Sequence, residues 1–168
     1  MSQLTLSLDS SLLVRDVAGD YRPANADEVL QAARRVLAEQ MRGCEALTSP
    51  QVVRDFLRVK LGTLEHEVFG VIHLDEQNRV IDYVETFRGT VSQTSAYPRE
   101  VVKEALARNS AALLLVHNHP SGAAEPSRAD EMLTQTLKSA LALVDMRVLD
   151  HLIVAGSAIL SLAEHGLL

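Results

Sequence analysis

The feature that most constrains this chain is an apolar run that leads directly into two histidines. Residues 111–116 read Ala-Ala-Leu-Leu-Leu-Val, and His117-Asn118-His119 follows at once. A short apolar run bounded by turn residues is typical of a buried strand. Because side chains two residues apart on a strand point to the same face, His117 and His119 face one side together. The chain is therefore expected to build a sheet that places two imidazoles at the end of a buried strand.

A carboxylate follows on a predicted helix. Residues 120–122 (Pro-Ser-Gly) turn the chain, and Ser127 then begins a helix that has Asp130 in its first turn. Two histidines and a carboxylate are ligands that zinc favours, and three protein ligands leave the fourth tetrahedral position open, as a catalytic site requires. We therefore predict a Zn²⁺ site formed by His117, His119 and Asp130.

Each half of this pattern also has an ordinary structural explanation. Ser127 and Asp130 form a variant of the capping box, with Asp in place of the usual Glu or Gln. A His-x-His pair on a strand is also found as two core histidines held by hydrogen bonds. The occurrence of both halves together, joined by a Pro/Gly loop, favours the metal site.

These residues resemble the motif of a known family. His-x-His-Pro followed by Pro-Ser-x-x-Asp is similar to the JAMM motif of the JAB/MPN domain family, and His-Asn-His-Pro-Ser-Gly resembles its bacterial RadC branch. Similarity extends to residues 87–90, 97–102 and 149–151 and covers residues 46–168 closely. The resemblance implies a cytidine-deaminase-like architecture. It also implies amide chemistry, since JAMM enzymes cleave peptide or isopeptide bonds, often to ubiquitin-like tails.

A general base is expected at the start of an earlier strand. Residues 67–74 are apolar on both faces after the first position, so the Glu67 carboxylate is expected to be partly desolvated, which suits a general base. The resemblance implies a catalytic glutamate at this same position. Glu65 is the alternative, and Glu67 could also simply begin the strand in solvent. Ser127, one helical turn before Asp130, could donate a hydrogen bond to the oxyanion of a tetrahedral intermediate.

Helices and strands alternate along the chain. The predicted helices run from Asn25 to about Arg42, from Pro50 to Gly62, from Pro98 to about Asn109, and from Ser127 to Val144; the predicted strands are 67–74, 79–87, 111–117, 147–154 and 159–160. The hairpin over 67–87 requires antiparallel pairing. We therefore predict an α/β fold with a mixed, largely antiparallel curved sheet flanked by helices on both faces.

The chain is expected to comprise an N-terminal extension over residues 1–45 and an MPN/JAMM domain over residues 46–168. Within the extension, alternating leucines over 4–8 are expected to pair with the apolar residues 12–14 as a short hairpin before the first helix.

Four histidines lie outside the motif. His66 and His165 stand at element edges and are expected to be exposed, and His73 occupies a position where RadC-like sequences usually carry an apolar residue. His151 is expected to be a hydrogen-bonded core or edge histidine. The alternative for His151 is a contact with one of the metal ligands.

The composition limits the partners and the location. The chain has 22 acidic and 16 basic side chains, a net charge of −6 and no basic stripe, which makes a nucleic-acid partner unlikely because such binding rests on Lys and Arg contacts to phosphates. No apolar run approaches the roughly 20 residues of a membrane span, and the N-terminus lacks the pattern of a signal peptide. A lone cysteine, Cys44, suits a reducing compartment. We therefore expect a cytoplasmic protein with no membrane contact.

Two functions are consistent with these observations. The first is a zinc-dependent hydrolase that acts on a protein or peptide substrate. The second is a non-enzymatic RadC-like protein associated with DNA repair or mobile elements, although residues before 46 lack a glycine hairpin and a basic cluster. An HNH nuclease is excluded, because the three residues of that motif are spread over tens of positions.

Overall fold

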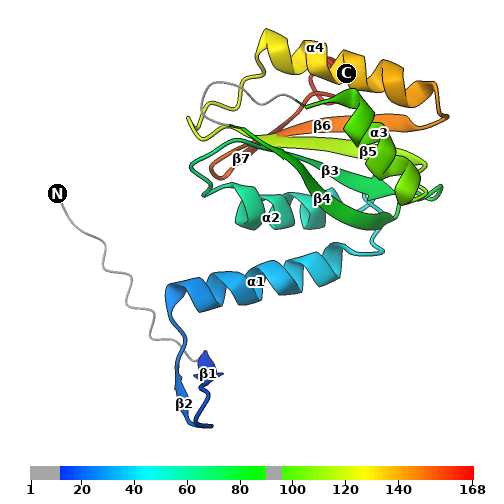
Figure 1. Ribbon diagram of the computed structural model, residues 1–168. Coiled ribbons are helices and arrows are strands. Elements are labelled where there is room, and N and C mark those ends of the chain that lie inside the picture. The colour runs from blue at the N-terminus through cyan, green and yellow to red at the C-terminus, as the bar shows by residue number, and fades with distance from the viewer. Residues whose placement is uncertain (1–11, 90–95) are drawn as a thin grey trace.

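The computed structural model describes residues 12–89 and 96–168. Its elements are β1 (Leu13–Arg15), β2 (Tyr21–Pro23), α1 (Ala26–Met41), α2 (Pro50–Leu61), β3 (Val68–Leu74), β4 (Val80–Arg88), α3 (Pro98–Ala107), β5 (Ala112–Asn118), α4 (Arg128–Ala142), β6 (Arg147–Ala155) and β7 (Ala158–Ser161). Figure 1 shows α3 and α4 on one side of the sheet and α2 and α1 on the other. The order of helices and strands from residue 25 onward is the one predicted from the sequence.

The central sheet has five strands in the order β4-β3-β5-β6-β7. Strands β5 and β6 run parallel, because α4 carries the chain between them, and every other neighbouring pair is antiparallel. The sheet is therefore open, mixed and largely antiparallel, which confirms the predicted fold class. The strand that ends in the two histidines, β5, is in the middle.

Both faces of the sheet are buried against helices. On β5, the side chains of Leu114 and Val116 join a core cluster with residues of α1 and α2 such as Phe56. The alternate positions, Leu113 and Leu115, join a second cluster with residues of α3 and α4. Because alternation continues along the strand, the side chain of His117 belongs to the face covered by α3 and α4.

Local sequence signals define the helix starts. The Asn25 side chain accepts from the Glu28 N–H and the Glu28 carboxylate accepts from the Asn25 N–H, which is the predicted capping box of α1. Helices α2 and α3 begin at Pro50 and Pro98, where proline has no hydrogen bond to lose. Ser127 caps α4 in the same manner as Asn25 caps α1.

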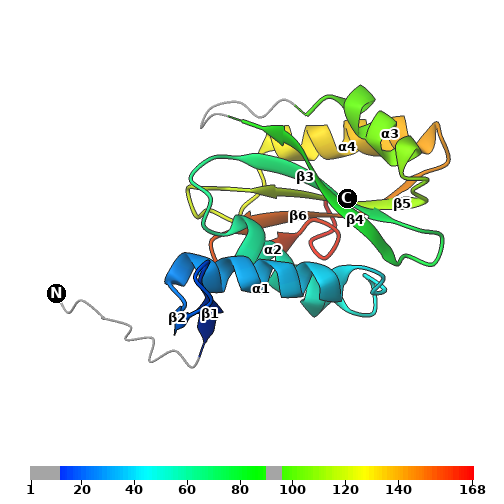
Figure 2. The same ribbon diagram turned by 60° about the horizontal axis from the view of Figure 1, so that its bottom comes forward.

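The described residues near the N-terminus form a hairpin that was not predicted from the sequence. Leu13–Arg15 pairs with Tyr21–Pro23, downstream, and the predicted partner over residues 4–8 lies outside the described residues. A turn at residues 16–20 favours the pairing of β1 with β2, because the Asp16 carboxylate accepts from two backbone N–H groups within this turn. In both views the hairpin lies at the N-terminal end of α1, away from the sheet (Figures 1 and 2).

Two of the four histidines outside the motif, His66 and His165, were predicted to be exposed. His165 is exposed, as predicted. His66 is only partly exposed and its Nε2 atom is enclosed, so the expectation of exposure was wrong. The reason is a tertiary contact, since the Asn118 side-chain amide donates to the His66 carbonyl and holds this segment on the end of β5. Among the helices of the described residues, none is both long and apolar enough to cross a membrane.

Candidate metal centre

The three predicted ligands lie together where β5 ends and α4 begins. The Nε2 atoms of His117 and His119 are 2.8 Å apart. The Asp130 carboxylate oxygens lie 3.3 Å from His117 Nε2 and 3.5 Å from His119 Nε2. These side chains offer three ligand atoms that all lie within 4.8 Å of one another, close enough to share one metal ion.

A chain of hydrogen bonds fixes the tautomer of His117. The Thr134 hydroxyl is 2.6 Å from the Asp130 carbonyl oxygen, which can only accept, so Thr134 donates there. Thr134 must then accept from Nδ1–H of His151, at 2.6 Å, and His151 Nε2 accepts from Nδ1–H of His117, at 2.9 Å. His117 therefore presents an unprotonated Nε2 to the site.

Burial keeps His151 neutral in this chain. The side chain is fully buried between β6 and α4. Burial lowers the pKa of His151 to about 3. A neutral His151 can accept from His117 at physiological pH, which the tautomer assignment requires.

A single hydrogen bond fixes the tautomer of His119. Its Nδ1 lies 2.6 Å from the carbonyl oxygen of Ala123, which only accepts, so Nδ1 carries the proton. The loop that supplies this carbonyl is closed by a bond from the Gly122 N–H to the His119 carbonyl, with Gly122 at a positive φ of 79°. A glycine adopts that conformation without strain. His119 Nε2 therefore also presents a lone pair.

The site consequently gathers acceptors with no donor between them. Two imidazole lone pairs and a carboxylate point at one small volume, an arrangement that is repulsive unless a cation lies at its centre. A donor set of two neutral histidines and one carboxylate is the set that zinc takes in open sites. The residues present therefore fit a divalent metal ion.

The capping residue of α4 is also part of the site. The Ser127 hydroxyl and backbone N–H both donate to Asp130 Oδ2 at 2.7 Å. Burial opposes ionisation of Asp130, yet its interaction with His117 and the hydrogen bonds from Ser127 outweigh it and hold the pKa of this carboxyl well below its usual value. Asp130 therefore belongs to the predicted capping box and to the predicted set of metal ligands, and its geometry is compatible with both.

Glu67 immediately precedes β3, next to the β5 strand end. The register pairs Phe69 with His117, and alternation carried back by two residues gives Glu67 the same face of the sheet. The Asn118 side chain accepts from the Val68 N–H at 2.7 Å and donates to the His66 carbonyl at 3.0 Å. Buried Asn118 thus holds the backbone on both sides of Glu67, whose own side chain is partly buried.

His151 and Asn118 are the site residues that sequence reasoning underestimated. For His151 we favoured a core or edge histidine over a contact with a ligand, and the structure shows both: it is buried and it binds His117. The resemblance at 149–151 was the available signal. Asn118 carried no signal beyond its position between the two histidines.

A shallow cavity adjoins the candidate metal centre. It has a volume of about 220 Å³ and includes His119, Asn118 and Glu65 in its lining, together with the apolar Leu61 and Leu64. The cavity therefore provides free space on the His119 side of the centre.

The chain is similar to proteins of one known family. Residues 47–167 match the family model described as "RadC-like JAB domain". The chain is 57% identical over 150 residues to a UPF0758 protein of Leptothrix cholodnii, covering 89% of this chain and 68% of that protein. It is 62% identical over 146 residues to one of Aromatoleum aromaticum, covering 86% and 65%. A UPF0758 protein of Methylibium petroleiphilum is 53% identical over 167 residues, covering 95% and 75%.

The chain spans about two thirds of the length of the first two of these relatives. The names of these relatives assign no activity. The matched family segment contains every predicted site residue, from Glu67 to Asp130. The chain therefore belongs to the RadC-like JAB domain family.

Proposed function

We propose that this protein is a zinc-dependent hydrolase of the JAMM type that cleaves peptide or isopeptide bonds. The observation that carries the proposal is the convergence of two unprotonated Nε2 atoms and one carboxylate at the end of β5. Family membership supports it, because the JAB/MPN superfamily includes hydrolases.

His117, His119 and Asp130 would hold the ion. Zinc bound there supplies Lewis acidity on the open side of the three ligands. Glu67 takes a proton from the attacking water and returns it to the leaving nitrogen. The Asn118 side chain, which binds the backbone on both sides of Glu67, keeps this carboxylate in position.

Ser127 would stabilise the oxyanion of the tetrahedral intermediate. Its single hydroxyl proton is donated to Asp130 Oδ2 in this structure. In that role the hydroxyl would donate to the oxyanion instead of to Asp130.

Metal content tests the ligand set. Purified wild-type protein is expected to contain one zinc per chain by elemental analysis, and a His117→Ala/His119→Ala double variant is expected to contain almost none. A His165→Ala variant is the matched control, because His165 is exposed and distant in sequence from the centre. Equal zinc in the wild type and the double variant would refute the site.

Activity tests the base separately from the ligands. Glu67→Gln keeps the side-chain shape and should retain zinc, yet lower the rate of peptide cleavage by at least about a hundredfold, the low end for a positioned acid–base group. A peptide library identifies the substrate first. Glu65→Gln is the control, since Glu65 is exposed. If Glu65→Gln lost cleavage and Glu67→Gln did not, Glu65 would be the general base.

A titration separates this proposal from a DNA-linked role. With 22 acidic and 16 basic side chains, the protein should bind labelled duplex DNA weakly at physiological salt. Submicromolar binding with a steep salt dependence would make the DNA role primary.

A further inference from the structure

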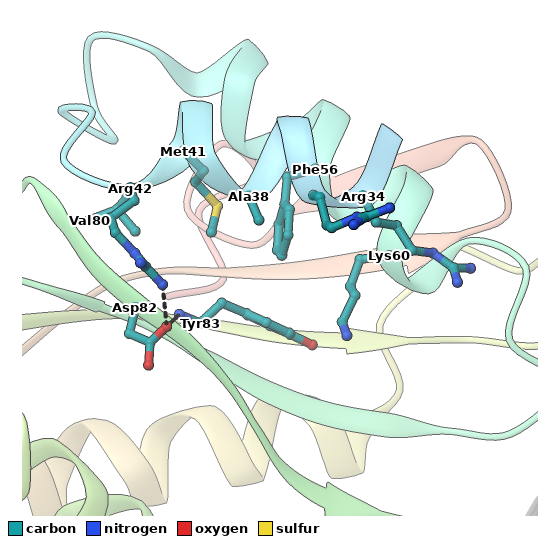
Figure 3. Close-up of a pocket in the computed structure, with 10 residues that line it drawn as sticks. Arg34, Ala38, Met41, Arg42, Phe56, Lys60, Val80, Asp82 and Tyr83 are labelled. Atoms are coloured by element: carbon teal, nitrogen blue, oxygen red, sulfur yellow. Dashed lines mark hydrogen bonds and ion pairs between the residues drawn. The ribbon is translucent and has the colours of Figure 1, made fainter. Parts of the chain in front are cut away.

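A second cavity lies on the opposite side of the sheet from the candidate metal centre. It has a volume of about 260 Å³ and is bounded by α1, α2 and the edge strand β4 (Figure 3). Its lining residues Met41, Phe56 and Val80 belong to the core cluster on the α1/α2 face, whereas the histidines belong to the α3/α4 face. The cavity is therefore separate from the proposed catalytic chemistry.

The charge of the cavity is opposite to that of the chain. Arg34, Arg35, Arg42 and Lys60 line it, although the chain as a whole has a net charge of −6. These residues come from two different helices, so no basic cluster is visible in the sequence. Clefts lined by one sign of charge concentrate ligands of the opposite sign.

Carboxylates neutralise only part of this charge. Lys60 Nζ lies 2.8 Å from Glu85, and Arg42 lies 3.9 Å from Asp82, a distance too long for a hydrogen bond. Arg34 and Arg35 contact no carboxylate among the described residues. Figure 3 shows Arg42 and Asp82 at one end of the cavity and Arg34 and Lys60 at the other, so the excess positive charge is concentrated at the second end.

The Arg34 guanidinium is held in place before any ligand binds. Its Nε donates to the Val59 carbonyl oxygen at 3.1 Å, which bridges α1 and α2. The two terminal nitrogens of Arg34 have no partner within the described part of the chain. A guanidinium fixed through Nε retains the pair of terminal N–H groups that bind phosphate in a bidentate manner.

The rest of the cavity is largely apolar. Its lining includes Ala38, Met41, Phe56 and Val80, and the Phe56 and Tyr83 rings pack edge to face with centroids 5.3 Å apart. Lys60 Nζ lies 5.9 Å from the Tyr83 ring centroid. An apolar lining beside guanidinium groups that contact no carboxylate matches a ligand with a ring at one end and an anion at the other.

We propose that this cavity binds a phosphate monoester that carries one nucleobase, of the nucleoside monophosphate class. The dianionic phosphate binds Arg34 and Arg35, with Lys60 beside them, and the ring packs on Met41 and Phe56. Two unpaired guanidinium groups favour a dianion over a single carboxylate. The volume of about 260 Å³ lies just below the usual range for ligand sites, so it suits a ligand no larger than one base, one sugar and one phosphate.

Adenosine monophosphate, AMP, is the probe, titrated into the full chain by calorimetry. AMP is expected to bind with a micromolar to low millimolar Kd. Adenosine and inorganic phosphate, which each supply half of the ligand, should bind at least about tenfold more weakly. Amide resonances of Val80 and Tyr83 should shift in a parallel NMR titration. Absence of saturation at millimolar AMP would overturn the proposal.

Variants test the position of the site. Arg34→Gln/Arg35→Gln should weaken AMP binding at least about tenfold. The control Arg99→Gln/Lys138→Gln removes the same charge from exposed positions on α3 and α4, and should bind AMP as the wild type does. Equal losses in both doubles would reduce the effect to net charge and contradict the site.

Two further measurements complete the test. Ala38→Leu fills the cavity without changing any charge, so it should also weaken AMP binding. This variant keeps the test valid if the Arg34→Gln/Arg35→Gln variant does not fold. Unchanged binding in Ala38→Leu would overturn the proposed position. A single-stranded oligonucleotide without a terminal phosphate should bind no more tightly than AMP. Tighter binding with a steep salt dependence would mark a nucleic-acid surface and reject the small-ligand assignment.

Discussion

At the scale of single residues, the Thr134 hydroxyl connects two of the proposed metal ligands. It donates to the Asp130 carbonyl and accepts from His151, which in turn binds His117. Groups that orient ligand histidines raise metal affinity, because they fix the tautomer and the direction of the lone pair.

Thr134→Val should therefore lower zinc affinity by about 10–100-fold while leaving all three ligands in place. Valine has nearly the shape of threonine but cannot accept from His151 or donate to Asp130. Competition with a chromogenic chelator measures the affinity. Thr136→Val is the matched control, since its hydroxyl donates to Met132 on the exposed side of the same helix. Equal affinities in the two variants would remove Thr134 from the site.

His73 is a buried histidine, outside the candidate metal centre, whose protonation affects the stability of the fold. It is fully buried on β3, with Nδ1 2.9 Å from the Ser110 hydroxyl. Burial, followed by the nearby positive charge of Arg108, lowers the pKa of His73 to about 4. The unfolded chain binds this proton near pH 6.5, so acid favours unfolding across the interval between the two values.

The free energy of unfolding should consequently fall as the pH drops from about 6.5 to 4, with His73 contributing at most about 3 kcal/mol. Below that interval the His73 contribution becomes constant. His73→Leu should remove this part of the pH dependence, as urea unfolding at pH 7 and pH 5 would measure. His165→Leu, at an exposed position, should retain the wild-type dependence. An unchanged slope in His73→Leu would contradict the assignment.

At the scale of elements, α2 ends against the turn between β6 and β7 at a distance that only glycine permits. A Cβ on Gly62 would lie 2.5 Å from the Gly156 carbonyl oxygen and 2.6 Å from the Arg58 carbonyl oxygen. Both neighbours are backbone atoms, so they cannot move aside as a flexible side chain does. The close approach holds α2 on the sheet beside the cavity that includes His119.

Gly62→Ala should destabilise the protein by about 1–3 kcal/mol, because overpacking forces the backbone apart. Thermal unfolding measures the loss, and Thr63→Ala at the adjacent exposed position should change the midpoint little. A Gly62→Ala variant as stable as the wild type would show that α2 and the β6–β7 turn can separate without loss.

At the scale of the whole molecule, α1 shares a core with the sheet. Met41 is 3% exposed and packs with Leu37, Ala38 and Phe56 in the cluster on the α1/α2 face. Residues 43–46 then bond to the start of β4, with the Gly43 N–H donating to the Val80 carbonyl. The division of the chain between residues 45 and 46 stays a prediction.

Truncation tests where the folding unit begins. A chain of residues 25–168 should be nearly as stable as the full chain, because the β1–β2 hairpin lies away from the sheet. A chain of residues 46–168 should lose about 3 kcal/mol or more, since it uncovers Phe56 and removes the burial of Met41. Urea unfolding compares them. Equal stability of residues 46–168 and the full chain would establish α1 as a separate extension.

Much of this architecture was predictable because its signals are local. The capping boxes at Asn25 and Ser127 lie within four residues, and the alternation that gives His117 and His119 one face is a property of any strand. The resemblance to a known family added the predicted family and the predicted role of Glu67 as general base. Local backbone preference and hydrophobic periodicity were therefore enough for the order of the elements from residue 25 onward and for the fold class, and the motif spacing was enough to group His117, His119 and Asp130.

The remaining features depended on contacts between distant segments. Parallel pairing of β5 with β6 brings His151 to His117, 34 residues earlier in the chain, and packing of α1 on α2 brings Arg34 near Lys60. Periodicity states which face a side chain occupies, but not which neighbour it meets there. That choice is made by strand register and by helix packing, because the free energy of a contact depends on which groups are buried together, and only the folded chain determines that.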